Sequence, residues 1–300
     1  MAIRIRIPWL LDLVLVSAPG EILTAANDPA LDRAFRPGRG PLVNRVIARR
    51  LDRGLRAGGV SLPSARRRED PERRAASGAL AARLDPAGAP WDEAALDALA
   101  SHVRGEGRRP AGELAQEAIG RLFAPAYCAD AETWRAALLI DASLKSNNPL
   151  RRLIWWVTGA IARAQARLAA AVDGDPSGVH ATGVAVHSFL RAVESLRHAL
   201  ADRERTRSLT DRGVLGRALT APDMVARVAV MDARIGDVAV DEGVLVILQT
   251  SGAAALCADR RVVFLSTSWS ACPASALAPV MLAQIWERAT NASKRTGDHP

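Results

Sequence analysis

The sequence predicts a mainly α-helical protein with a small β component, organised as a single domain over residues 1–300. Apolar residues make up 49% of the chain but aromatic residues only 4%, so Ala, Leu and Val must build most of the core. Such a composition favours helices over sheets. The apolar residues also recur mostly at helical spacing, and the runs that resemble strands are few and short. At this length the chain can bury a full-sized core.

The positive charge of the chain does not by itself predict nucleic-acid binding. The net charge is +8, but only Lys145 and Lys294 among the 40 cationic residues are lysine, and the arginines are scattered along the chain. The densest runs, at 66–68 and 104–109, have no neighbouring aromatic residues on which bases stack. We therefore do not expect nucleic acid as a partner. A nucleic-acid-associated protein stays an alternative only if the arginines converge on one surface.

Cysteine usage and the N-terminal segment indicate a cytoplasmic protein with no membrane span. Cys128, Cys257 and Cys272 are an odd number at unrelated spacings, which argues against a disulfide framework and fits a reducing compartment. The apolar run at 9–16 is interrupted by Asp12. It is also far shorter than the roughly 20 residues that a membrane-spanning helix needs.

The first quarter of the chain predicts one strand and two helices. Leu13–Ser17 reads as a buried strand, and after a tight turn Glu21–Phe35 has apolar residues at helical spacing. The second helix begins with Asp70 as N-cap and Pro71 at its first position, and it runs to Leu84.

The middle of the chain is predicted to be helical throughout. Helices are expected at Trp91–Val103, Gly112–Phe123, Ala131–Leu144, Leu150–Val172 and Val179–Leu200. The last of these has the length and broad apolarity of a central helix. Within Leu150–Val172 the centre, Leu153–Val157, is apolar on every side, so we expect that centre to be buried.

The C-terminal third predicts a few short strands and one helix. Ala226–Val230 reads as a strand, and Asp237–Val240 and Gly243–Leu248 read as the two strands of a hairpin. A helix is expected from Pro273 to Thr290. The polar tail at 291–300 is expected to be frayed.

The segment around Cys272 carries the clearest chemical signal. A loop of mostly small residues delivers this cysteine to the start of a helix whose first residue is Pro273. The partial positive charge at a helix N-terminus stabilises a thiolate. A thiolate is the axial ligand that heme-thiolate iron needs. An inert, buried cysteine is the alternative interpretation.

This segment resembles the proximal loop of the cytochrome P-450 family, in which a glycine-rich loop, a Cys-Pro-Gly step and an Ala-x-x-Leu-Ala helix follow one another. Four further segments resemble the family and occur in the same order. They are Leu13–Phe35, Asp70–Ser77, Arg217–Ala229 and Asp232–Leu248. The chain therefore resembles a shortened, divergent cytochrome P-450.

Several family features are missing, and their loss predicts a compacted version of the fold. Ala274 stands where the family has a glycine, and Ser270 replaces the His or Arg that contacts a heme propionate. Val214 takes the position of the glutamate in the ExxR motif. Only 28 residues separate Gly243 from Cys272, so the proximal meander of the family is missing.

The resemblance implies a heme b cofactor whose iron is bound by Cys272. The two heme propionates are negatively charged and are normally neutralised by arginine. By position in the family pattern, Arg227 lies on the strand after the ExxR helix and Arg74 on the helix that Asp70 opens. These two residues are expected to bind the propionates.

The resemblance also places candidate catalytic residues on the predicted central helix. Thr182 matches the family threonine whose hydroxyl helps to deliver protons to the bound oxidant, although no acid precedes it. His180 and His187 are seven residues apart and would share one face of an α-helix. A histidine there suits acid–base cleavage of a peroxide. The alternative is that these polar residues are simply packed and hydrogen-bonded to backbone.

The leading functional hypothesis is a heme-thiolate oxidoreductase that acts on a hydrophobic organic small molecule. The missing distal acid favours a peroxide-dependent enzyme over a full monooxygenase. A redox protein or another protein partner fits this hypothesis. The alternative is an inactive scaffold of the same fold that has lost heme and binds a protein partner, which the loss of the glycines, the Glu–Arg pair and the meander favours.

Overall fold

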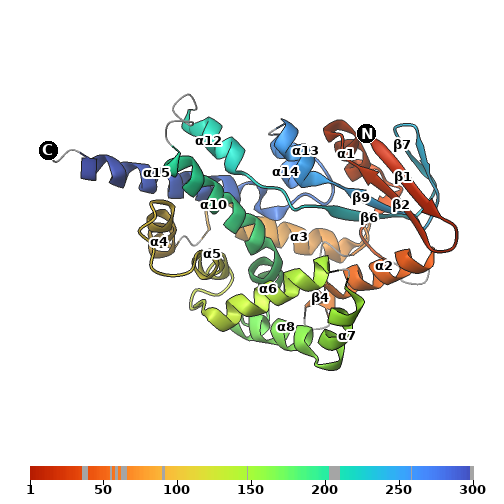
Figure 1. The fold of residues 1–300 in the computed structure, drawn as a ribbon, viewed down its shortest axis with the longest axis horizontal. Helices are drawn as coiled ribbons and strands as arrows, with labels where there is room; N and C mark the ends of the chain where they lie inside the picture. Colours follow the sequence, from red (N-terminus) through yellow and green to blue (C-terminus); the bar gives the residue numbers. More distant parts are fainter. Residues whose placement is uncertain are drawn as a thin grey trace. The chain divides into compact units, whose positions relative to one another are not determined.

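The computed structural model describes residues 1–35, 40–54, 56–57, 60–61, 66–89, 92–146, 148–202, 210–257 and 259–297. The chain divides into two compact units. Unit 1 consists of Met1–Leu80 and Ala221–Ser275, and unit 2 consists of Ala81–Thr220 and Ala276–Pro300. The main sheet belongs to unit 1, whereas unit 2 is built from helices (Figure 1).

Unit 1 is built on a five-stranded sheet with the strand order β1-β2-β9-β6-β3. The strands are β1 (Ala2–Ile7), β2 (Leu11–Val16), β9 (Leu245–Leu248), β6 (Val225–Ala229) and β3 (Leu31–Asp32). β2 and β9 pair in parallel, and the other three pairs are antiparallel. Alternate side chains of β2 are buried, as the two-residue period of a strand requires. The strands predicted at 13–17 and 226–230 are both confirmed.

A buried carboxylate ties β1 to its neighbours. Asp12, only 6% exposed, accepts hydrogen bonds from Nε and Nη2 of Arg4 at 2.9 and 2.7 Å. Arg4 also donates to the backbone oxygen of Ala239 at 2.8 Å and to Asp241 at 2.5 Å. These acidic partners raise the pKa of Arg4. The charge that interrupts the apolar N-terminal run is therefore held by a bidentate ion pair inside the sheet.

Two predicted elements of unit 1 differ in the structure. Helix α1 (Pro19–Asn27) stops where Asp28 precedes a proline, a position that disfavours helical dihedrals, so the predicted helix over 21–35 is too long. The predicted hairpin of 237–240 with 243–248 is wrong. β8 (Val238–Val240) pairs instead with β7 (Ala233–Ile235), and β9 enters the main sheet.

The remaining elements of unit 1 are short helices and a second small strand pair. They are α2 (Leu42–Gly54), β4 (Arg56–Ala57), β5 (Val60–Ser61), α3 (Pro71–Arg83), α13 (Thr250–Cys257) and α14 (Arg260–Phe264). α3 begins as predicted, because Asp70 accepts a hydrogen bond from the backbone N–H of Glu72 at 2.9 Å. The last residues of α3 fall in unit 2.

Unit 2 is a helical bundle around α10 (Val186–Ala201). α10 contacts α4 (Glu93–Val103), α5 (Ala111–Gly120), α12 (Asp211–Ala218) and α15 (Leu277–Gly297). A second group pairs α6 (Ala131–Lys145) with α8 (Ala160–Ala171). The helix predicted at 131–144 is confirmed as α6, and the one at 112–123 is α5, which ends at Gly120. The helix predicted at 179–200 spans the end of α9 (Pro176–His180), a π-helical segment (Ala181–Ala185) and α10. The helix predicted from Trp91 begins at Glu93 with Asp92 as its N-cap, and Trp91 itself lies outside the described residues.

The long helix predicted over Leu150–Val172 is in fact two helices, α7 (Pro149–Val157) and α8. Gly159 separates them with a φ of +61°, a left-handed conformation that glycine adopts readily. The expectation that the centre is buried is also wrong. Trp155 is 8% exposed, but Trp156 is 73% exposed and the other three residues of 153–157 are at least half exposed.

The helix after Cys272 also begins differently from the prediction. Pro273–Ser275 form a 3-10 turn, η3, and α15 begins only at Leu277. α15 then continues to Gly297, past the predicted end at Thr290. Cys272 therefore precedes a tight turn, and the long helix follows that turn.

Glycine lets two aromatic rings pack closely on α5. A Cβ atom at Gly120 would lie 2.3 Å from the ring of Tyr127, and one at Gly112 would lie 2.2 Å from the ring of Trp134. Because Tyr127 is only 2% exposed and its ring would have to shift, we expect Gly120→Ala to lower the free energy of unfolding by about 1–3 kcal/mol. Urea unfolding followed by circular dichroism measures this loss.

The matched control is Gly216→Ala on α12, where no atom lies within 4 Å of the added Cβ. This control is expected to be neutral or to stabilise the protein by up to about 1 kcal/mol, because alanine is the better helix former. An equal loss in both variants would contradict the packing argument.

Candidate functional site

Cys272 lies in unit 1 at the end of a tightly bonded loop. Its backbone N–H donates to the carbonyl of Phe264 at 2.8 Å. Burial raises the pKa of this thiol, and the backbone N–H of Ala274 and the charge of Arg33 only partly oppose that rise. The expected stabilisation of a thiolate by the helix N-terminus is therefore outweighed by burial in the protein alone.

Three arginines gather beside this loop from three different elements. Arg227 on β6 is fully buried (0% exposed), Arg73 on α3 is 5% exposed, and Arg33 follows β3 and is half-buried. Two acidic side chains of the described part of unit 1 act on them, Asp32, 8% exposed, and Asp70, which acts on Arg73 together with the positive charge of Arg68. Positive charge therefore exceeds negative charge inside this unit.

Asp32 is already engaged by the backbone. Its Oδ1 accepts from the N–H groups of Arg33 and Ala34 at 2.6 and 3.2 Å, and its Oδ2 accepts from the N–H of Arg68 at 3.3 Å. Meanwhile the buried Nε atoms of the three arginines, and Nε1 of Trp269, have no hydrogen-bond partner among the described residues. Buried donors without acceptors are rare, so this cluster lacks an acceptor.

Trp269 organises two of the three arginines. The guanidinium carbons of Arg73 and Arg227 lie 4.3 and 5.5 Å from the centre of its ring, within cation–π range. Arg73 Nη2 also donates to the carbonyl of Trp269 at 2.6 Å, and Arg227 Nη2 donates to the hydroxyl of Ser270 at 2.5 Å. The loop before Cys272 thus holds both guanidinium groups through neutral partners.

The electrostatics of the cluster favour an anion. Burial, reinforced by the charge of Arg33, lowers the pKa of Arg227 well below its ordinary value. Burial and the charge of Arg73 lower the pKa of Arg33 to about 10, and burial also lowers the pKa of Arg73. Arginine remains charged under ordinary conditions. The lowered pKa values therefore indicate that nearby negative charge does not fully compensate the three guanidinium groups. A group with two negative charges would compensate them.

The arginine on α3 that joins this cluster is Arg73, which the sequence analysis did not select. The structure places Arg74 on the exposed side of α3, and its proposed role stays a prediction. Helical spacing could have identified Arg73, because it shares a face with Ala76 and Leu80, which are half-buried. No local pattern identifies Arg33 or Trp269, since their roles depend on contacts between distant segments.

Thr182 lies in unit 2 within a π-helical segment, η2 (Ala181–Ala185), between α9 (Pro176–His180) and α10. Its side chain is fully buried, and its hydroxyl donates to the carbonyl of Gly178 at 2.8 Å. Gln116, also fully buried, donates from Nε2 to the carbonyl of Thr182 at 3.1 Å. π-helical segments frequently occur at functional sites, so the segment around Thr182 is a candidate for function.

The two candidate histidines flank this segment. The π segment separates His180 from His187, so the α-helical spacing that predicts a shared face does not apply across it. His187 packs on the ring of Trp134, with centroids 5.2 Å apart, and its Nε2 lies 3.2 Å from the carbonyl of Ala137. Burial lowers the pKa of His187, which favours a neutral, backbone-bonded ring. Catalytic roles for His180 and His187 stay predictions.

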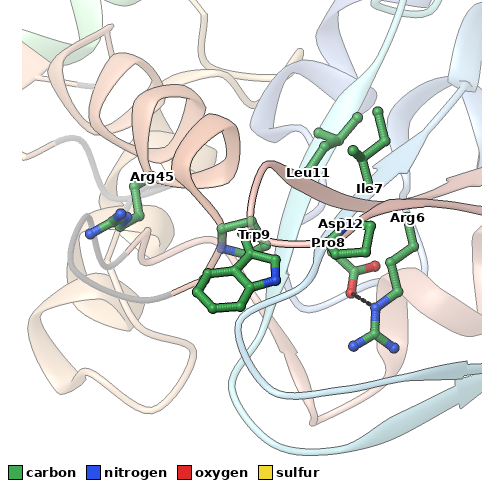
Figure 2. Close-up of a pocket in the computed structure, with 9 residues that line it drawn as sticks. Arg6, Ile7, Pro8, Trp9, Leu11, Asp12 and Arg45 are labelled. Carbon is green, nitrogen blue, oxygen red and sulfur yellow. Dashed lines mark ion pairs between the residues drawn. The ribbon is translucent and has the colours of Figure 1, made fainter.

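A surface pocket of about 440 Å³ opens at the turn between β1 and β2. Figure 2 shows Trp9 and the Arg6–Asp12 ion pair at its wall. Trp9 is 91% exposed and has a φ of +66°, which is rare for a bulky residue. None of the residues predicted for the site lines this pocket, so we treat it as separate from the arginine cluster.

Several solved structures share the architecture described above. The enzyme CxnD, which forms a C–S bond in chuangxinmycin biosynthesis, matches with a TM-score of 0.61 and 12% identity, over 93% of this chain and 79% of its own. The LnmA hydroxylase of Streptomyces atroolivaceus S-140 has a TM-score of 0.58 and 15% identity, over 98% and 85%. Both are cytochrome P-450 enzymes. The chain has the cytochrome P-450 fold.

A third cytochrome P-450, BioI, was solved with an acyl carrier protein that carries hexadec-9Z-enoic acid. It matches with a TM-score of 0.57 and 14% identity, over 95% of this chain and 85% of its own. No protein-family model matches the sequence, and none of the curated proteins does. The P-450 fold is therefore evident in three dimensions but not in the sequence comparisons.

This version of the P-450 fold is compacted and departs from the family pattern on its proximal side. The matches described above span 79% to 85% of the other chains, which confirms the predicted shortening. Val214, at the position of the ExxR glutamate, is buried, and Arg217 is exposed. The described residues include no helix with the length and apolarity to cross a membrane.

Gln116 is the residue whose removal tests the buried polar contacts of the π segment. It donates to two carbonyls, those of Thr133 at 3.0 Å and Thr182 at 3.1 Å. We expect Gln116→Leu to lower the free energy of unfolding by about 1–3 kcal/mol, because both buried carbonyls lose their donor. Urea unfolding measures the loss, and hydrogen exchange locates it at residues 181–185.

The matched control is Gln284→Leu on α15, where the side chain is half-buried and accepts one long hydrogen bond from Arg288, at 3.3 Å. This variant is expected to change stability by no more than about 0.5 kcal/mol. Faster exchange at the π segment in the control as well would show that the effect is not specific to Gln116.

Proposed function

We propose that this protein is a heme-thiolate oxidoreductase of the cytochrome P-450 type, which uses heme b and acts on a hydrophobic organic small molecule. The observation that carries the proposal is the excess of buried positive charge beside Cys272. Arg33, Arg73 and Arg227 have unpaired donors, and the nearby carboxylate of Asp32 is already engaged. Heme b brings the two carboxylates that such a cluster lacks.

The residues present in unit 1 fit this cofactor. Cys272 is the candidate ligand of the iron. The described residues contain no group of three or more His, Cys, Asp and Glu side chains that could hold a metal ion. A metal bound to this cysteine would therefore need its other ligands from a cofactor such as a porphyrin. When bound, the heme would supply the oxidising chemistry at its iron. The protein supplies the position and the charge.

The loop before Cys272 performs two tasks in this proposal. The backbone N–H of Ala274 lowers the pKa of the thiol and so favours its charged form, although burial outweighs this effect in the protein alone. The contacts of Trp269 hold the guanidinium groups of Arg73 and Arg227 in place before any anion arrives. A preorganised pair of this kind loses little side-chain conformational entropy when it binds a dianion.

In unit 2 we propose that Thr182 and the two histidines handle protons. The hydroxyl of Thr182 can exchange its hydrogen bond to Gly178 for one to a bound molecule, as the unwound π segment leaves the local backbone less regular. His180 and His187 flank this segment, and imidazole is a side chain suited to acid–base catalysis. This set has no distal acid, which supports dependence on peroxide. A redox protein would be the partner if dioxygen is used instead.

One observation favours the alternative of an inactive scaffold that binds a protein partner. The Glu–Arg pair of the family has no counterpart, because Val214 is buried and apolar while Arg217 is exposed. The following two experiments separate the two functions, because a scaffold would remain colourless.

The first experiment replaces each cysteine by serine. We expect the protein, expressed with heme supplied, to show a heme-thiolate absorption band after reduction and addition of carbon monoxide. Cys272→Ser should abolish this band, because it removes the axial ligand. Cys128→Ser and Cys257→Ser are the matched controls and should leave the band intact, since both residues are exposed. Loss of the band in all three variants, or no band in the parent protein, would refute the assignment.

The second experiment compares two neighbouring arginines of α3. Arg73→Ala is expected to lower heme occupancy about tenfold or more, because a buried guanidinium group that pairs with a carboxylate is lost. Arg74→Ala removes the same charge from the exposed side of the same helix and should leave occupancy nearly unchanged. The ratio of heme absorbance to protein concentration measures both. A larger loss for Arg74→Ala would return the role to the residue predicted from sequence.

A further inference from the structure

Helix α7 carries its apolar stripe on the outside of unit 2. Four apolar residues lie at the i, i+3, i+4 and i+7 positions and therefore on one helix face, namely Leu150, Leu153, Ile154 and Val157. Such a stripe normally faces the core of a globular protein. Here the four side chains are 65%, 53%, 53% and 70% exposed, and the packed side of α7 is the one that carries Trp155. Nothing in the described part of unit 2 covers the stripe.

The two edges of the stripe carry the residue types that favour a boundary between water and hydrocarbon. Trp156 lies at one edge and is 73% exposed. Arg151 lies at the other, with its guanidinium carbon 4.9 Å from the centre of the Trp155 ring. This stacking holds the charge beside the stripe. Tryptophan and arginine both place an apolar body in hydrocarbon and a polar end in water.

The chain around α7 has only positive charges. Between Asp141 and Asp173 the sequence contains no acidic residue, and its cationic residues are Lys145, Arg151, Arg152, Arg163 and Arg167. Two of them form ion pairs with flanking acids, Lys145 with Asp141 at 2.9 Å and Arg167 with Glu132. Arg151 and Arg152 of α7 and Arg163, which follows it, therefore give this stretch of the chain a net positive charge that complements an anionic surface.

We propose that α7 docks flat on an anionic phospholipid surface, with the stripe among the outer acyl chains and the arginines at the lipid phosphates. A helix with a strong apolar face, a cationic polar face and tryptophan at its edge has the pattern of an interfacial helix. The cationic residues beside the stripe complement lipid phosphates, and this charge complementarity is the ground for choosing a lipid surface as the occupant. This docking is peripheral, since α7 has only nine residues, and it does not depend on the proposed heme.

Co-sedimentation of the full chain with vesicles tests the proposal. We expect binding to vesicles that contain phosphatidylglycerol, much weaker binding to pure phosphatidylcholine, and a decrease with salt because charge contributes. The double variant Leu153→Gln with Ile154→Gln should bind about tenfold more weakly or less, because two apolar side chains no longer enter the hydrocarbon. Both positions are exposed, so the variant is expected to fold normally, which thermal unfolding checks.

The matched control replaces two apolar side chains that are exposed elsewhere, Leu256→Gln with Met224→Gln, which are 82% and 59% exposed in unit 1. This control should bind vesicles as the parent protein does. Equal weakening in both double variants would overturn the proposal, as would the lack of binding to any vesicle. Concentration-dependent self-association that the α7 variant abolishes, without vesicle binding, would assign the stripe to a second copy of the chain and also overturn it.

A second measurement locates the contact without relying on a loss of binding. Lipids with brominated acyl chains quench tryptophans that enter the hydrocarbon. We expect quenching of the parent protein, and a clear reduction of that quenching in Trp156→Phe, with vesicle binding retained. Trp9, at the β1–β2 turn, is the most exposed tryptophan in the described chain at 91%. If Trp9→Phe removes the quenching instead, unit 1 makes the contact and the proposal for α7 is overturned.

Discussion

Buried like charges are the constraint on which the rest of unit 1 depends. Arg33, Arg73 and Arg227 arrive from a strand end, a helix and a central strand, and each loses solvation when the sheet and its helices pack. Burial of a charge without a partner is among the most costly changes in folding. The fold tolerates it here because the ring of Trp269 faces two of the guanidinium groups, and because these two groups also donate to the carbonyl of Trp269 and the hydroxyl of Ser270.

In the proposed function, that arrangement would take the place of residues of the P-450 pattern that the chain lacks. Ser270, where the family has a cation, is neutral, yet it accepts a hydrogen bond from Arg227 and so helps to fix the direction of that guanidinium group. Arg33 adds a charge from a part of the chain far away in sequence. Compared with the family pattern, the positive charges lie on the elements around the cysteine loop and not on the loop itself. The loop contacts these arginines and fixes their side chains.

In unit 2 the polar groups around the π segment bond mainly to backbone. Thr182 bonds to Gly178, Gln116 donates to two carbonyls, and Nε2 of His187 lies near the carbonyl of Ala137. In the proposed function, chemistry at these groups would require that one of these hydrogen bonds be exchanged. The exposed apolar stripe of unit 2 lies instead on α7, with Arg151 at one edge and Trp156 at the other.

The sequence by itself determined the helical class, the order of most elements and the loop that delivers Cys272, because helical periodicity, N-caps and proline act within a few residues. Arg227 was selected because it matches the family's arginine on the strand after the ExxR helix, and tertiary packing buries it beside the cysteine loop. The choice of Arg73 over Arg74, the recruitment of Arg33 and Trp269, and the entry of β9 into the main sheet were decided only by tertiary packing. The clearest case is α7. Its apolar residues predict a buried helix, but which face is buried depends on the rest of the fold, and there Trp155 faces inward while the stripe faces out.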